Sequence, residues 1–331
     1  MPDESFSFDK IYYYAIQEDV KNIVESINKF PEDSLTYDQK ELKSKYNNRF
    51  LTHSEKITFS TKDSLLNKIL TTFHNYWYEI LMKESSVRSA DQKYRIILIK
   101  QLTSISNSGN HKIEPDKIQF DFRNALRSLL KENGYFNRLD RTGNIMDLII
   151  WTRQTVKIYD VNLEDTVLKV PVVLIDSALS YGWEGFATFD HFYPGGWTSP
   201  DTLFCITKDY DLSSEKFIVS YLTHESQHLF DAKIYKDYPT WVAEYRAKLA
   251  ELSVADSTLY NLLNGFIKGH KNDSRLPHPY AEYMLIIGLS KELLNEDFET
   301  DINIWKKIPK TDINTVSRRL LKENSLTLKL K

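Results

Sequence analysis

In the first 135 residues, apolar side chains recur every three or four positions, which places them on one face of a helix. The sequence therefore predicts these helices: Asp9–Phe30, Thr61–Lys83, Ala90–Ser106 and Pro115–Glu132. A turn-forming run at residues 106–110 separates the last two helices. Gly134 follows the last helix and predicts its C-terminal cap, because glycine readily takes the left-handed conformation needed there.

Near residue 147 the apolar and β-branched residues begin to gather in shorter runs bounded by turn-forming residues. Strands are expected at Leu148–Val161, Thr166–Asp176, Trp183–Phe189 and Thr202–Thr207. Helical spacing then returns at Glu215–Lys236, Thr240–Leu252, Leu259–Lys268, Tyr280–Leu294 and Thr311–Asn324. We therefore expect an α+β protein with a helical N-terminal region at residues 1–145. A second domain at residues 146–331 would hold a small mixed sheet followed by a helical C-terminal part.

Composition narrows the possible partners. The formal net charge is −3, and no basic stripe indicates a nucleic-acid partner. No apolar run approaches the roughly 18–20 residues needed for a membrane span. The first residues lack the features of a signal peptide. We expect a cytoplasmic protein if Met1 is the native start, and an exported one if a leader has been removed.

The chain has a single cysteine, Cys205. One cysteine excludes an intramolecular disulfide and a cysteine-rich zinc finger. Cys205 lies in the apolar run at residues 203–206, so we expect a small buried hydrophobic side chain rather than a catalytic thiol.

The pentapeptide His224-Glu225-Ser226-Gln227-His228 carries the strongest chemical signal in the sequence. It lies inside a predicted helix, where residues four apart share one face, so both imidazoles can bind one zinc ion. Glu225 lies one position round the helix, from where its carboxylate can reach a water on that metal. The sequence therefore predicts a zinc site with His224 and His228 as ligands and with Glu225 beside a water bound to the metal.

A catalytic zinc ion usually has three protein ligands. Asp231 lies on the same helix, about 10 Å beyond His224 at 1.5 Å per residue, so it cannot be the third ligand. We expect it to be a residue supporting the ligands or a solvated surface group. Glu244 and Glu251, both on the next predicted helix, are the stronger candidates.

A His-Glu-x-x-His motif followed by a glutamate on the next helix resembles the gluzincin group of zinc metallopeptidases, the thermolysin-like group. In that group a small residue commonly lies three or four positions past the ligand glutamate, as Ala247 does after Glu244. Glu251 matches less well and would then support a ligand. The gap before Glu244 is shorter than usual in the group, so Glu251 stays the alternative third ligand. The resemblance covers roughly residues 180–255. It implies a zincin-like metallopeptidase domain at residues 146–331.

The resemblance also implies a hydrolase that cleaves peptide or protein substrates. Zinc would lower the pKa of a bound water, and Glu225 would accept its proton and pass it to the leaving amine. Gluzincins bind extended substrate along the edge of a sheet. Ala187–His191 or Trp197–Cys205 is expected to form that edge. The Gly195-Gly196 pair would allow close approach of a substrate backbone, or simply form a hairpin turn.

A tetrahedral oxyanion needs a further hydrogen-bond donor. The candidates are His278, Tyr280 and Tyr283 after the motif, and His191 and Tyr193 before it. For each of them alone, a structural role is the commoner expectation in a chain with 20 tyrosines.

Two other functions remain open from the sequence. The chain could be a binding or regulatory protein that keeps a structural zinc site, although such a site has no use for Glu225. It could also be a zinc hydrolase that acts on a non-peptide substrate, which the motif alone does not exclude. Cleavage specificity and oligomeric state do not follow from the sequence.

Overall fold

The structure is a computed structural model that describes residues 6–55, 61–107, 115–163 and 166–329. The chain forms two compact units, and each combines separate stretches of sequence. The first unit is Met1–Arg153 with Ser177–Pro194, and the second is Gln154–Asp176 with Gly195–Lys331. Compactness does not tell whether a part folds alone, so the expected domains at residues 1–145 and 146–331 stay a prediction.

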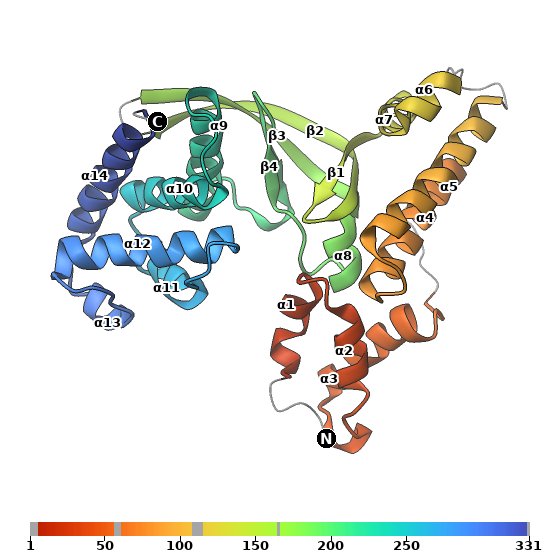
Figure 1. The fold of residues 1–331 in the computed structure, drawn as a ribbon, viewed down its shortest axis with the longest axis horizontal. Helices are drawn as coiled ribbons and strands as arrows, with labels where there is room; N and C mark the ends of the chain where they lie inside the picture. Colours follow the sequence, from red (N-terminus) through yellow and green to blue (C-terminus); the bar gives the residue numbers. More distant parts are fainter. Residues whose placement is uncertain (1–5, 56–60, 108–114, 164–165, 330–331) are drawn as a thin grey trace. The chain divides into compact units, whose positions relative to one another are not determined.

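Helices make up most of the first unit (Figure 1). They are α1 (Ile11–Ala15), α2 (Val20–Ile27), α3 (Tyr37–Tyr46), α4 (Ser64–Leu81), α5 (Val87–Asn107), α6 (Pro115–Phe120), α7 (Phe122–Glu132) and α8 (Gly182–Thr188). Shorter 3₁₀ or π turns are found at Phe8–Lys10, Glu32–Ser34 and Asn47–Leu51. Apolar residues from α1, α2, α4, α5, α7 and α8 share one buried core, in which Trp77 and Leu126 are fully buried.

The expected N-terminal helices are confirmed in place but not always in length. The chain breaks the helix expected at residues 9–30, because Glu18 takes a left-handed φ of 60° between α1 and α2. Asp121 interrupts residues 115–132, where its side chain caps α7. Gly134 has a φ of 82° just past α7, as expected of a helix cap. The turn expected at residues 106–110 lies mostly outside the described residues.

Within the described residues, one sheet contains β1 (Phe136–Thr142), β2 (Ile145–Leu163), β3 (Thr166–Tyr181), β4 (Gly196–Thr198) and β5 (Leu203–Ile206). The strand order is β1-β2-β3-β5-β4. β1 pairs antiparallel with β2, β3 pairs parallel with β5, and β4 pairs antiparallel with β5. A mixed sheet that precedes the motif helix, together with the many helices, confirms the α+β class.

The strand expected at Trp183–Phe189 is wrong, because this segment forms α8. Its apolar run fits a buried strand and a buried helix equally well by composition. α8 begins at Gly182, which has a φ of 80°, a conformation that glycine adopts readily. A Cβ atom there would lie 2.3 Å from Asp147 Oδ1. That oxygen accepts a hydrogen bond from the Trp183 backbone N–H at 2.8 Å and so holds the first turn of α8.

The second unit holds the motif helix and the C-terminal helices. They are α9 (His224–Ile234), α10 (Thr240–Val254), α11 (Leu259–Gly269), α12 (Pro277–Leu294), α13 (Ile302–Trp305) and α14 (Lys310–Lys329). A π-helical turn, Phe217–Thr223, leads directly into α9, and a 3₁₀ turn spans Thr207–Asp209. α10 packs against α9, α12 and α14 (Figure 1). Among the residues that the structure describes, no helix is both long enough and apolar enough to cross a bilayer.

A buried ion pair joins three helices of the second unit. The Arg246 guanidinium on α10 donates to Asp231 on α9 through Nε and Nη2, at 2.8 and 2.9 Å, and both side chains are fully buried. Arg246 Nη1 also donates to Ser325 Oγ on α14 at 3.0 Å. Asp231 is therefore not a solvated surface group, because the folded helices exclude water from it and pair it with Arg246.

We expect Arg246→Met to lower the free energy of unfolding by about 3–5 kcal/mol, because Asp231 would keep a buried charge without its partner. Urea denaturation followed by circular dichroism measures the loss. The double variant Asp231→Leu/Arg246→Met should recover most of it. The control Arg319→Met removes an exposed pair with Glu292 and should cost less than about 1 kcal/mol. Equal losses in Arg246→Met and Arg319→Met would contradict the assignment.

Candidate metal centre

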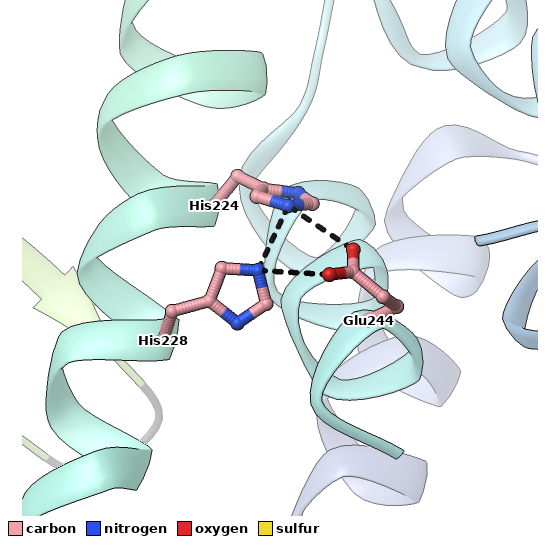
Figure 2. A group of neighbouring side chains, drawn as sticks. All are labelled: His224, His228 and Glu244. Atoms are coloured by element: carbon pink, nitrogen blue, oxygen red, sulfur yellow. Dashed lines mark hydrogen bonds and ion pairs between the residues drawn. The ribbon is translucent and has the colours of Figure 1, made fainter. Parts of the chain in front are cut away.

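The two motif histidines and Glu244 come together on facing turns of α9 and α10 (Figure 2). His224 Nε2 and His228 Nε2 lie 3.1 Å apart. The Glu244 carboxylate lies 3.5 Å from each, with Oε2 next to His224 and Oε1 next to His228. The side chains of His224, His228 and Glu244 are 12%, 20% and 10% exposed. They form a largely buried group whose ligand atoms can all face one ion.

The spacing of these atoms fits a tetrahedral metal ion. Zinc bonds to nitrogen and oxygen of roughly 2.0–2.1 Å give a tetrahedron whose edges are about 3.3 Å. The two imidazole nitrogens lie 3.1 Å apart, and each has a Glu244 oxygen at 3.5 Å, Oε2 for His224 and Oε1 for His228. With one ligand atom taken from each residue, all three atoms lie within 4.8 Å of one another, which is compatible with one metal ion. Two imidazoles and one carboxylate are also a common donor set for catalytic zinc, with the fourth position left for water. The residues present therefore fit the ion that the motif predicts.

Glu251 lies beside His224 rather than in the group of three. Its Oε1 atom is 2.6 Å from His224 Nδ1. Because a carboxylate only accepts hydrogen bonds, Nδ1 must carry a hydrogen, and a metal bound to this ring would then take the Nε2 lone pair. Carboxylates commonly fix metal-binding histidines in this way.

The charges around the group favour a cation. Burial lowers the pKa of His224, but hydrogen bonds to Glu244 and Glu251 outweigh burial and raise the pKa to about 10. Burial raises the pKa of Glu244, but hydrogen bonds from His224 and His278 hold that pKa far below its usual range. Burial and the neighbouring His224 charge lower the pKa of His228. The negative charges of Glu244 and Glu251 thus keep a proton on His224. The same negative charges would stabilise a divalent cation.

Glu225 is held by a residue that the sequence did not single out. The Thr198 hydroxyl donates a hydrogen bond to Glu225 Oε2 at 2.6 Å. Thr198 ends β4, which lies at one end of the strand order. Nothing in the sequence pattern links a threonine to a glutamate 27 positions later. The link depends on how the sheet edge packs against α9.

Of the candidate oxyanion donors, His278 reaches the group. Its Nδ1 atom lies 2.9 Å from Glu244 Oε2, and its side chain is 61% exposed. Tyr280 packs edge-on against Trp241, with ring centres 5.1 Å apart, and Tyr283 packs against Phe298 at the same distance. In the second unit, His278 is thus the candidate whose side chain joins the metal-ligand residues.

The two upstream donors, His191 and Tyr193, belong to the first unit. His191 stacks on Tyr12 with ring centres 4.6 Å apart, and Tyr193 stacks on Tyr181 at 4.2 Å. Both rings therefore have packing partners within their own unit.

The expected substrate edge is only partly as predicted. Ala187–His191 is not a strand, because it contains the last turn of α8 and two left-handed residues, Phe189 and Asp190. The segment 197–205 contributes to β4 and β5, and β4 ends the strand order. Gly196 leaves no room for a side chain of its own, and the close approach of a substrate backbone there stays a prediction. A Cβ atom there would lie 2.4 Å from both the Phe204 carbonyl oxygen and the Tyr221 ring.

Cys205 is fully buried on β5, as expected for a small hydrophobic side chain. Burial raises the pKa of its thiol to about 12. The thiol therefore stays protonated at neutral pH, which leaves it unreactive as a nucleophile.

We expect protein purified without chelator to contain about one zinc ion per chain, because two imidazoles and a carboxylate converge on one point. Elemental analysis should find the metal in the wild type and little of it in His228→Ala. The variant His191→Ala removes a histidine of the first unit and should keep the metal. Equal metal content in wild type and His228→Ala would rule out this site.

We expect Glu244→Gln to weaken zinc binding more than Glu251→Gln does. Glu244 would supply a ligand oxygen, whereas Glu251 would only orient His224, and the loss of such an orienting group typically costs about 10–100-fold in affinity. Competition with a fluorescent zinc chelator measures both dissociation constants. Glu292→Gln on the surface of α12 is the matched control. The opposite ranking would make Glu251 the third ligand.

Comparison with known proteins adds no relative. No family model matches the chain, and neither a curated protein nor a solved structure matches it.

Proposed function

We propose that this chain is a zinc-dependent peptidase of the gluzincin kind. One observation carries the proposal: His224, His228 and Glu244 each offer a ligand atom within 4.8 Å of the others, and Glu225 follows directly after the first of these residues. A purely structural zinc site needs no such neighbouring carboxylate. A zinc ion bound there would activate a water molecule and polarise the carbonyl that the water attacks.

The protein's own groups have distinct roles in this proposal. Glu225 accepts a proton from the attacking water and delivers it to the leaving amine. The Thr198 hydroxyl, 2.6 Å from Glu225 Oε2, keeps that carboxylate in one orientation. Glu251 fixes the hydrogen of His224 on Nδ1 and so keeps Nε2 free to bind the metal. His278 adds an exposed imidazole beside the ligand group, where it can donate to a developing oxyanion.

The position of β4 supports a peptide as the substrate. β4 pairs with β5 on one side and ends the described strand order, so its other edge can accept hydrogen bonds from an extended chain. Thr198 joins this edge to the catalytic base. A substrate backbone added to β4 would therefore lie next to Glu225. This arrangement favours a peptide over a compact small molecule.

We expect Glu225→Gln to keep its zinc and to lose peptide hydrolysis by at least about 100-fold, because glutamine has nearly the same shape but cannot accept the proton. A peptide-library digest read by mass spectrometry compares wild type, Glu225→Gln and wild type treated with a chelator. Glu292→Gln is the matched surface control and should cleave like the wild type.

The outcome separates the functions that the sequence left open. Cleavage by the wild type and by Glu292→Gln alone supports a peptidase. Cleavage that persists in Glu225→Gln contradicts the role of Glu225. A wild type that binds zinc and cleaves no peptide in the library points instead to a structural zinc site or a non-peptide substrate.

A further inference from the structure

The first unit contains a cavity that the proposed peptidase chemistry does not use. The cavity has a volume of about 320 Å³ and is lined by residues of α5, of the first turn of α7, and of β1 and β2. Every lining residue belongs to the first unit. This volume is in the range of small-molecule sites, which begin at about 300 Å³.

Positive charge dominates the cavity wall. Four arginines line it: Arg88 and Arg95 on α5, Arg123 on α7 and Arg141 on β1. Arg88 and Arg95 are seven positions apart on one helix, so they lie on the same face. Among the described residues, Asp91 is the one carboxylate that lines the cavity with them. Like charges that converge on one space repel each other, and an anion between them removes that cost.

Asp91 does not neutralise the whole group, because its oxygens already have partners. Its Oδ1 atom accepts a hydrogen bond from the Tyr76 hydroxyl at 2.6 Å, and Oδ2 pairs with Arg141. Tyr76 is buried in the core of the unit. The hydrogen bond from Tyr76 holds Asp91 in place, and Asp91 in turn holds Arg141.

The other three guanidinium groups remain available to a ligand. Within the described part of the chain, Arg88 and Arg123 form no ion pair, and Arg95 donates only to the Gln119 carbonyl oxygen at 3.2 Å. All three side chains are exposed. Arginine presents a planar fork of donors that matches a phosphate group, and it binds such groups more specifically than lysine does.

The cavity also has an apolar side. Phe122 and Met146 line it, and the Arg95 guanidinium lies 5.8 Å from the centre of the Phe122 ring. An aromatic or apolar group can therefore pack there while an attached anion reaches the arginines. From this combination we propose that the cavity binds a phosphate monoester with an aromatic or apolar organic part.

Phenyl phosphate is a suitable probe, because it carries both chemical groups in the smallest form. We expect wild-type protein to bind it at low salt in a ligand-observed NMR titration, more tightly than phenol and more tightly than inorganic phosphate in competition. Arg88→Gln and Arg123→Gln should each weaken binding by about tenfold, the cost of a lost charged hydrogen bond. Arg153→Gln removes an exposed arginine of the same unit outside the cavity and should leave the affinity unchanged.

A further variant separates this site from the metal centre. His228→Ala should bind phenyl phosphate as the wild type does, and circular dichroism should show that each variant is folded. Loss of binding in His228→Ala would place the phosphate at the metal centre and overturn the proposal. Equal affinities in Arg88→Gln, Arg123→Gln and Arg153→Gln, or no binding by the wild type, would also overturn it. If inorganic phosphate bound as tightly, the apolar part of the proposal would be wrong.

Discussion

The arrangement of the second unit depends on the buried Asp231–Arg246 ion pair. Asp231 follows His228 on α9, and Arg246 follows Glu244 on α10 by two residues. The pair therefore fixes the position of one helix along the other within a turn of the ligands. A buried pair with two parallel hydrogen bonds tolerates little sliding, because any shift leaves a charge without its partner. The spacing of His224, His228 and Glu244 follows from that constraint.

The local parts of the candidate site could be read from the sequence. Two histidines four apart must share a helix face, and a glutamate on the next helix must lie near them if the helices reverse. The contribution of Thr198 could not be read, because it depends on how a sheet edge packs on α9. The burial of Asp231 could not be predicted either, because it depends on how α9 packs against α10 and not on the pattern within one helix.

The fold shows the same division between local and tertiary information. Long amphipathic helices such as α4 and α5 were predicted well, because their apolar stripe repeats over many turns. α3 was missed because its polar surface hides the pattern, although Thr36 and Gln39 form a reciprocal cap at its start. α8 was taken for a strand because it is short and apolar. Its helical form follows from the left-handed Gly182 and the buried Asp147, which no local pattern reveals.

The absence of a side chain at Gly196 has a consequence at a distance. Gly196 and Thr198 lie two apart on β4 and so share one face of the strand, while Tyr221 and Glu225 lie about one helical turn apart. Gly196 sits against the Tyr221 ring, and Thr198 bonds to Glu225. The strand and the helical segment therefore contact each other at two successive positions. The close contact between Gly196 and Tyr221 sets the distance between Thr198 and Glu225. A single added methyl group at Gly196 would therefore shift the Glu225 carboxylate, although it touches no atom of Glu225.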